Sequence, residues 1–187
     1  MTAAPTFGRY TEIPVDRMTP EQRAGYRHLV DGPRGRLPGP YKVWVHNPKL
    51  AQAANPLGLH FTPGESSLSE REREIAVLVI NSRWHSAYPT TAHEKRGKEV
   101  GLPDAAIAAI VAGHPTGFTD KREQLVYEVA TSLAGNRLIP QALYDRAVDG
   151  LGHDGITDMI VLMGYYTAVC LTMNFYAVAP GTPGLAR

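Results

Sequence analysis

An apolar run directly behind a helix-start signal constrains the fold of this chain most strongly. Ser69 and Glu72 have the spacing of a capping box, in which a serine caps a helix and a glutamate three residues later bonds back to it. All six residues from Ile75 to Ile80 are apolar. A helix that is apolar nearly all round has no side to turn to water, so the sequence predicts a central, buried helix.

The remaining chain is also punctuated as a helical protein would be. Thr19 followed by Pro20 predicts a helix that runs to about Val30. Further helix starts are signalled at Pro89, Pro103, Thr119, Pro140 and Asp154. Since no alternating strand pattern of useful length occurs, we predict an all-α bundle of about seven to eight helices. We expect residues 1–38 to form an N-terminal arm and first helix, and residues 39–180 to form the main helical domain.

Composition narrows the classes of partner. The net charge is +1 and the basic residues are scattered, which predicts no nucleic-acid partner. We see no run of about eighteen apolar residues, so we predict no membrane partner either. The single cysteine, Cys170, lies in an apolar run and is expected to be a buried, unpaired thiol. One cysteine and no secretory signal at the N-terminus favour a cytoplasmic location.

The stretch from Glu74 to His93 is the most informative for chemistry. Asn81 and His85 follow Glu74 by seven and eleven residues, so on a continuous helix all three fall near one face. Tyr88 and His93 belong to the start of the next helix, and an antiparallel neighbour can bring His93 to Glu74. A carboxylate, an imidazole and a phenol in one apolar pocket are the groups that general acid–base catalysis uses.

A purely structural interpretation of the same residues remains open. Glu74 lies near a helix start, where an acid favours the helix dipole and where Arg71 or Arg73 can pair with it. His93 is followed by charged residues, as a surface histidine often is. Core or turn packing is the corresponding interpretation of Trp84, His85 and Tyr88.

These residues resemble the carboxymuconolactone decarboxylase/alkylhydroperoxidase-D-like superfamily, over about residues 40–180. In its redox branch a glutamate precedes a Cys-x-x-Cys pair, and a histidine follows four residues after the second cysteine. Glu74 and His93 match the two outer positions, whereas the cysteine positions fall on Ser86 and Pro89. A decarboxylase-like branch has the stretch Trp-Asn-Ser-Glu-Tyr-Glu-Trp-x-x-His. Trp84, Ser86, Tyr88 and His93 agree with this stretch, and His85, Ala87, Pro89 and Thr90 depart from it.

The resemblance implies a decarboxylase-like enzyme and not a thiol peroxidase, because the two cysteines are missing. Glu74, His93 and Tyr88 are the expected catalytic residues. The expected substrate-binding residues are His85, Trp84, Ser86, Tyr41, His46 and Asn174. We predict no cofactor and no metal, since neither a phosphate loop nor a metal-ligand spacing is present.

Two functional hypotheses follow. The first is a cofactor-free acid–base enzyme acting on a small carboxylated or cyclic carbonyl compound, by decarboxylation, isomerisation or lactone chemistry. The second is a non-catalytic oligomer that binds a small ligand, which the altered residues Ala87, Pro89 and Thr90 favour. In either case the apolar helices over residues 72–83 and 156–176 exceed what one small domain can bury, so a homo-oligomer is expected: a dimer, trimer or hexamer.

Overall fold

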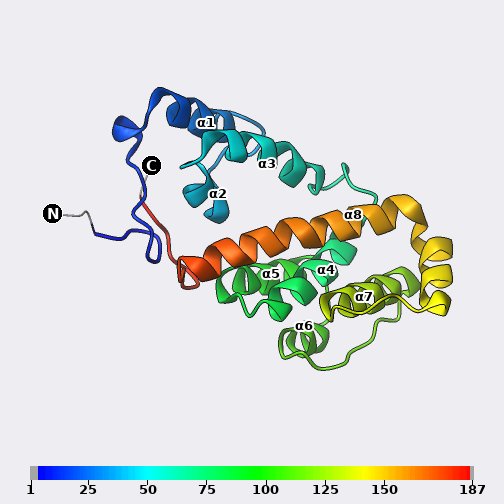
Figure 1. Cartoon of the computed structure of the whole chain (residues 1–187). Helices are drawn as coiled ribbons and strands as arrows, with labels where there is room; N and C mark the ends of the chain where they lie inside the picture. The colour runs from blue at the N-terminus through cyan, green and yellow to red at the C-terminus, as the bar shows by residue number, and fades with distance from the viewer. Residues whose placement is uncertain (1–3, 186–187) are drawn as a thin grey trace. The chain divides into compact units, whose positions relative to one another are not determined.

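The computed structural model describes residues 4–185, and its secondary structure is helical (Figure 1). The elements in chain order are the 3-10 helix Val15–Arg17 and the α-helices α1 (Pro20–Val30), α2 (Gly39–Trp44), α3 (Pro48–His60), α4 (Glu70–Arg83), α5 (Ala87–Glu99), α6 (Asp104–Val111), α7 (Lys121–Ala134) and α8 (Gln141–Phe175). Within the described residues the only β-type pairing is one bridge between Phe7 and Tyr10. The prediction of an all-α fold is confirmed.

The chain divides into two compact units. Unit 1 contains residues 1–60 and 172–187, and unit 2 contains residues 61–171. This division differs from the boundary after residue 38 that the sequence favoured. The physical reason is that α1 shares a core with α2 and α3, since Leu29, Tyr41 and Ala51 are all fully buried in one cluster. The first helix is therefore part of a larger body and not of a separate arm.

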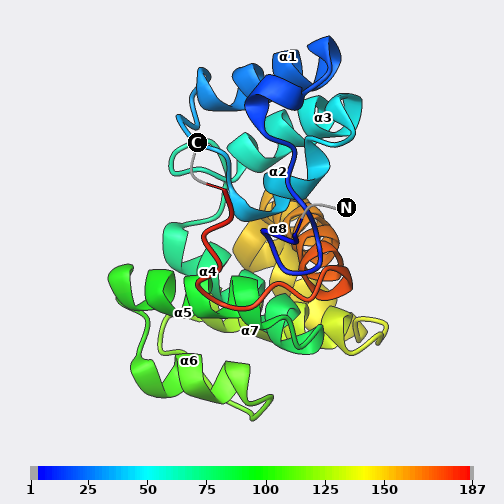
Figure 2. The same ribbon diagram turned by 90° about the vertical axis from the view of Figure 1, so that its left-hand side faces the viewer.

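In unit 1, α1 and α3 lie side by side in both views (Figures 1 and 2). The start of α1 has the capping box that the sequence predicted, with Thr19 and Gln22 bonding each other's backbone amides. The buried carboxylate of Glu12 joins the two ends of the chain. It accepts hydrogen bonds from the Thr6 hydroxyl at 3.1 Å and the Leu185 amide at 2.5 Å, and it lies 3.4 Å from the Lys42 ammonium.

In unit 2, α4 is the central helix. Its start has the predicted capping box between Ser69 and Glu72, and every residue from Glu72 to Asn81 is buried. The apolar core extends from α4 to α5–α6, α7 and α8, through side chains such as Ile107, Val126 and Met159. The prediction of a central, buried helix is confirmed.

Two arginine–glutamate pairs hold the start of α4 against α7. The Arg122 guanidinium contacts the buried Glu72 carboxylate at 2.8 Å and also donates to the Gly150 carbonyl at 2.6 Å. In the second pair the roles are exchanged: α4 supplies the cation, Arg71, and α7 supplies the carboxylate, Glu123, at a distance of 2.5 Å. The Arg122 pair therefore connects α4, α7 and the bend of α8 in one polar network.

α8 is bent at Gly152, whose backbone has φ of 68° and ψ of 171° and so cannot be helical. By length and composition α8 is nonetheless apolar enough to cross a membrane, with a window of mean hydropathy 1.5. The segment contains no unbroken apolar run in the sequence, because Asp158, Thr167 and Thr172 interrupt it. Core helices of globular proteins have the same property, and Met159, Leu162 and Met163 of α8 are part of the core of unit 2.

Candidate functional site

The structure brings Glu74 and His93 into contact. Glu74 lies in the second turn of α4, and His93 lies in the middle of α5, which packs against α4. The distance from His93 Nδ1 to Glu74 Oε2 is 2.6 Å. The glutamate side chain is only 5% exposed, whereas the histidine side chain is 18% exposed. The Glu74 carboxylate is therefore buried, and the His93 imidazole is the member of the pair that is more accessible to a solute.

This contact sets the chemistry of the imidazole. An ionised carboxylate can only accept hydrogen bonds, so the hydrogen of a neutral imidazole belongs on Nδ1. The lone pair is then on Nε2, which has no hydrogen-bond partner among residues 4–185. An imidazole oriented by a buried carboxylate, with its second nitrogen free, can take up a proton from a substrate.

A tyrosine that the sequence did not single out as a site residue contacts this pair. The ring of Tyr166, from α8, meets the His93 ring edge to face, with centroids 4.9 Å apart and an interplanar angle of 89°. Tyr165 and Phe61 continue the aromatic cluster, at centroid distances of 5.6 Å and 6.4 Å along the chain of rings. Tyr166 therefore forms one wall of the site.

The turn between α4 and α5 has a geometry that the sequence did not reveal. α4 ends at Arg83, and His85 adopts a left-handed backbone with φ of 48°. The His85 amide bonds the Ser82 carbonyl and the Ser86 amide bonds the Asn81 carbonyl, which is the Schellman pattern of a helix end. The expectation that His85 shares a helix face with Glu74 is wrong, because the helix stops before it; the His85 side chain is exposed.

We expect His85→Gly to raise the free energy of unfolding by about 0.5–1 kcal/mol. A left-handed backbone costs a non-glycine residue about 1–2 kcal/mol, and the entropy of glycine in the unfolded chain offsets part of the gain. Urea unfolding measures the change, with His85→Ala as the control that keeps the strain. A glycine variant less stable than the alanine variant would contradict the expected relief of backbone strain.

Beneath this turn, Ser86, Asn81 and Cys170 form a buried polar group. The Cys170 thiol donates to Asn81 Oδ1 at 3.1 Å, and the Ser86 hydroxyl donates to the Cys170 carbonyl at 3.4 Å. Asn81 Nδ2 is buried and has no hydrogen-bond partner among the described residues. These hydrogen bonds link the end of α4 and the start of α5 to Cys170 of α8, so they hold the turn between α4 and α5 against α8.

Comparison with known proteins was made by sequence and by structure. No protein-family model matches the chain, and no curated protein sequence is significantly similar to it. Several solved structures share its architecture, including the following two. An uncharacterized peroxidase-related protein from Silicibacter sp. TM1040 superposes with a TM-score of 0.72 at 19% identity, over 97% of this chain and 96% of that one. The chain has the alkylhydroperoxidase-D-like fold. The debrominase Bmp8 in complex with 2,3,4-tribromopyrrole superposes with a TM-score of 0.64 at 11% identity, over 85% of this chain and 84% of that one.

By the sequence resemblance, Ser86 and Pro89 stand where the redox branch has its two cysteines, and both residues are buried. The single cysteine lies elsewhere, on α8. Desolvation by burial raises the pKa of the Cys170 thiol to about 11, an effect only partly offset by its hydrogen bonds. The thiol is therefore protonated near neutral pH and is a poor nucleophile.

We accordingly expect Cys170 to resist thiol reagents. Iodoacetamide at neutral pH should leave the folded protein unlabelled, because the reactive thiolate is scarce and the side chain is fully buried. Mass spectrometry checks this, with the urea-unfolded protein as the positive control. Rapid labelling of the folded protein would contradict the buried, protonated state.

The other residues that the sequence predicted for the site do not gather around the Glu74–His93 pair. Tyr88 is half-buried in the first turn of α5, and five residues along a helix turn its side chain about 140° away from that of His93. Trp84 is 38% exposed and donates from its indole to the Thr167 hydroxyl at 3.3 Å. The other three candidates, Tyr41, His46 and Asn174, belong to unit 1; Tyr41 is fully buried in its core, whereas His46 and Asn174 are exposed.

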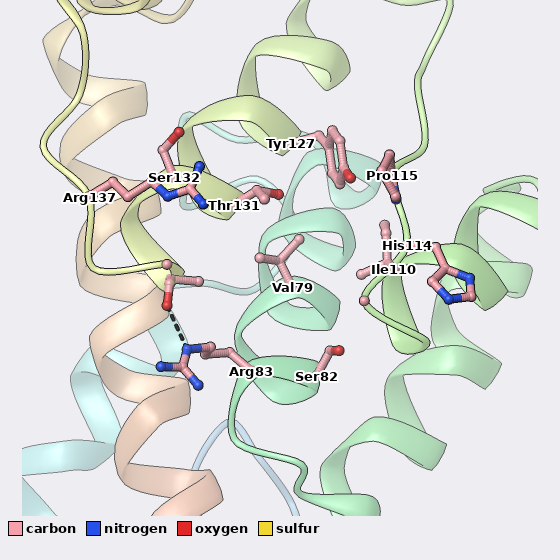
Figure 3. Close-up of a pocket in the computed structure, with 13 residues that line it drawn as sticks. Val79, Ser82, Arg83, Ile110, His114, Pro115, Tyr127, Thr131, Ser132 and Arg137 are labelled. Atoms are coloured by element: carbon pink, nitrogen blue, oxygen red, sulfur yellow. Dashed lines mark hydrogen bonds between the residues drawn. The ribbon is translucent and has the colours of Figure 1, made fainter.

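No metal cluster marks the Glu74–His93 pair among the described residues. Within residues 4–185 no group of three or more His, Cys, Asp or Glu side chains is arranged to hold a metal ion. A cavity of about 420 Å³ lies in unit 2, but its lining comes from α4, α6, α7 and the loops after them (Figure 3). The Glu74–His93 pair is not part of this cavity.

Proposed function

We propose that this protein is a cofactor-free acid–base enzyme acting on a small carboxylated or cyclic carbonyl compound. Decarboxylation, isomerisation and lactone chemistry are the reactions that such a site suits. The observation that carries the proposal is the 2.6 Å contact between Glu74 and His93, which orients an imidazole with an unpaired Nε2. Ser86 and Pro89 at the redox positions, together with the protonated Cys170, argue against a thiol peroxidase.

In this proposal His93 transfers a proton between its Nε2 atom and a carbon atom of the substrate. Unprotonated Nε2 removes a proton from a carbon next to a carbonyl group; in a decarboxylation, protonated Nε2 instead donates a proton to the carbon that carbon dioxide leaves. The Glu74 carboxylate holds the ring in one tautomer and stabilises the imidazolium that forms. The edge-to-face contact with the Tyr166 ring limits how the imidazole can turn. Tyr88 is not assigned a part in this step, because its side chain lies about 140° around α5 from that of His93.

Comparison with Bmp8 supports the small, cyclic form of the substrate and not its carbonyl or carboxylate group. That protein, which shares the fold, is described as a debrominase and was crystallised with 2,3,4-tribromopyrrole. A small cyclic compound is therefore compatible with this architecture.

Proton exchange tests the proposal across several candidate substrates at once. A panel of small β-keto acids, cyclic ketones and lactones is incubated with the protein in D₂O and followed by proton NMR. An acid–base enzyme should exchange the hydrogens next to the carbonyl group of at least one compound, and His93→Gln should remove this exchange. If no compound exchanges faster than in buffer, the proposed reaction class is wrong.

A non-catalytic ligand-binding protein is the second candidate. The substitutions relative to the decarboxylase-like stretch at Ala87, Pro89 and Thr90 favour it, because they replace two acids and a tryptophan. This candidate predicts that a compound co-purifies with the protein or binds to it, as mass spectrometry detects, and that the bound compound shows no exchange in D₂O.

We also propose that the protein is a closed homo-oligomer: a dimer, trimer or hexamer. On α8, Ile160, Val161 and Leu171 are 47%, 39% and 47% exposed, which is unusual for aliphatic side chains on one helix. Light scattering at micromolar concentration should give at least twice the chain mass of 20.4 kDa. Ile160→Glu should lower that mass, whereas Leu138→Glu, at a position that is 95% exposed, should not. A mass of one chain would contradict the proposal.

A further inference from the structure

A cavity of about 420 Å³ lies in unit 2 where the C-terminal ends of three helices meet, apart from the Glu74–His93 pair (Figure 3). α4 contributes Ser82 and Arg83, the end of α6 leads into Gly113 and His114, and α7 contributes its last two turns. The volume is at the lower end of the range of about 300–1,000 Å³ that small-molecule sites occupy. A single ring or a short chain is therefore the size of ligand that fits.

One side of this cavity is apolar. Val79 of α4 and Ile110 of α6 are 8% and 4% exposed, and the half-buried ring of Tyr127 extends the same surface. These side chains supply contact area but no acceptor for a charged ligand. The apolar body of a ligand gains free energy here by leaving water.

The polar part of the lining is cationic. Arg83, Arg137 and His114 line the cavity, and no aspartate or glutamate is among the lining residues. Among residues 4–185 neither Arg83 nor Arg137 forms an ion pair with a carboxylate. The partial negative charge of the helix ends offsets part of this positive charge, but neither exposed guanidinium has a carboxylate partner among the described residues, so the two groups can hold an anion.

Structural roles account for only part of this positive charge. Arg83 Nε donates to the Ala134 carbonyl at 2.8 Å, so one of its donors caps the end of α7 (Figure 3). Its other donors have no partner among the described residues, and neither do those of the Arg137 side chain. The Tyr127 hydroxyl accepts from the Thr116 amide at 3.2 Å, and its own hydrogen is left to donate. The cavity therefore offers more donors than its own acceptors use.

We propose that this cavity binds a small organic anion that carries a carboxylate on an apolar ring. The guanidinium groups of Arg83 and Arg137 hold the carboxylate, and Val79, Ile110 and Tyr127 hold the ring. This site is separate from the proposed acid–base site, since Glu74, His93 and Tyr166 are not in its lining.

Benzoate is the probe for this site, followed by amide NMR on the ¹⁵N-labelled protein. We expect shifts that saturate and that gather in residues 110–115 and 131–137. The Arg83→Gln/Arg137→Gln double variant should bind benzoate at least about 10-fold more weakly, the scale of losing charged hydrogen bonds. The matched control is Arg17→Gln/Arg36→Gln, which removes two exposed arginines of unit 1 and should bind as the unaltered protein does. Arg137→Gln alone breaks no hydrogen bond of a described residue, so it keeps the test valid if the double variant unfolds.

Two further ligands separate the charge from the ring. Benzamide keeps the ring without the charge, and inorganic phosphate keeps the charge without the ring; each should bind more weakly than benzoate. The proposal is overturned if benzamide binds as tightly as benzoate, or if the arginine variants bind benzoate unchanged. It is equally overturned if benzoate shifts only the amides around Tyr88 and His93, or if about 10 mM benzoate shifts none.

Discussion

Replacing His93 or Glu74 by glutamine should lower the turnover of a substrate by roughly 10²–10⁴-fold, the usual effect of removing a positioned acid–base group. His93→Gln removes the proton carrier. Glu74→Gln keeps the size of the side chain but removes the charge that stabilises the imidazolium, across a contact of 2.6 Å. The double variant should be little slower than the slower single variant, because the two groups act as one unit. Steady-state rates measure all three effects.

The controls for this prediction are Glu65→Gln and His153→Gln, which alter exposed residues of the same types. Both should keep near-normal rates, and circular dichroism should show that all variants are folded. Tyr88→Phe should cost less than either change in the pair, since the Tyr88 side chain lies about 140° around α5 from that of His93. If the Glu74 and His93 variants turn over a substrate at normal rates, the pair is structural.

The second large effect concerns stability. Arg122→Gln should lower the free energy of unfolding by about 2–3 kcal/mol, because it leaves the buried Glu72 carboxylate without its cation. The Glu72 side chain is 5% exposed, and the variant also loses the bond to the Gly150 carbonyl. The Arg122 side chain is 42% exposed, so the expected loss is smaller than the loss of about 3–5 kcal/mol for a fully buried pair.

Arg146→Gln is the matched control for this change. It breaks another arginine–glutamate pair, with Glu128, in which the arginine is 56% and the glutamate 28% exposed. Solvent screening limits its cost to less than about 1 kcal/mol. Urea unfolding compares the two variants. Equal losses would mean that burial of the glutamate does not set the strength of these pairs.

The features that the sequence predicted well are those that depend on neighbouring residues. The capping boxes at Thr19 and Ser69 consist of residues three apart, so their spacing gives the helix starts directly. The contact between Glu74 and His93 was also accessible, because the two helices are adjacent in the chain and only a short turn separates them.

The features that the sequence did not show depend on distant residues or on the exact end of a helix. Tyr166 lies 73 residues after His93 in an apolar helix, and nothing in its neighbours distinguishes it from a core residue. His85 was placed on the wrong face because one left-handed residue ended α4 without a glycine to announce it. The division into units at His60 and Leu171 results from tertiary packing, which leaves no local pattern.

The contacts between residues 9–12 and residues 176–185 in unit 1 affect the order in which parts of the protein can fold during synthesis on the ribosome. The Arg9 amide bonds the Tyr176 carbonyl, and Glu12 bonds the Leu185 amide, so residues 9–12 gain these contacts only after residues 176–185 have been synthesised. Residues 61–171 form a continuous unit whose contacts become available earlier. Until residue 176 has been synthesised, the N-terminal segment therefore carries Tyr10, which is buried in the folded protein, without the Tyr176 ring that it contacts.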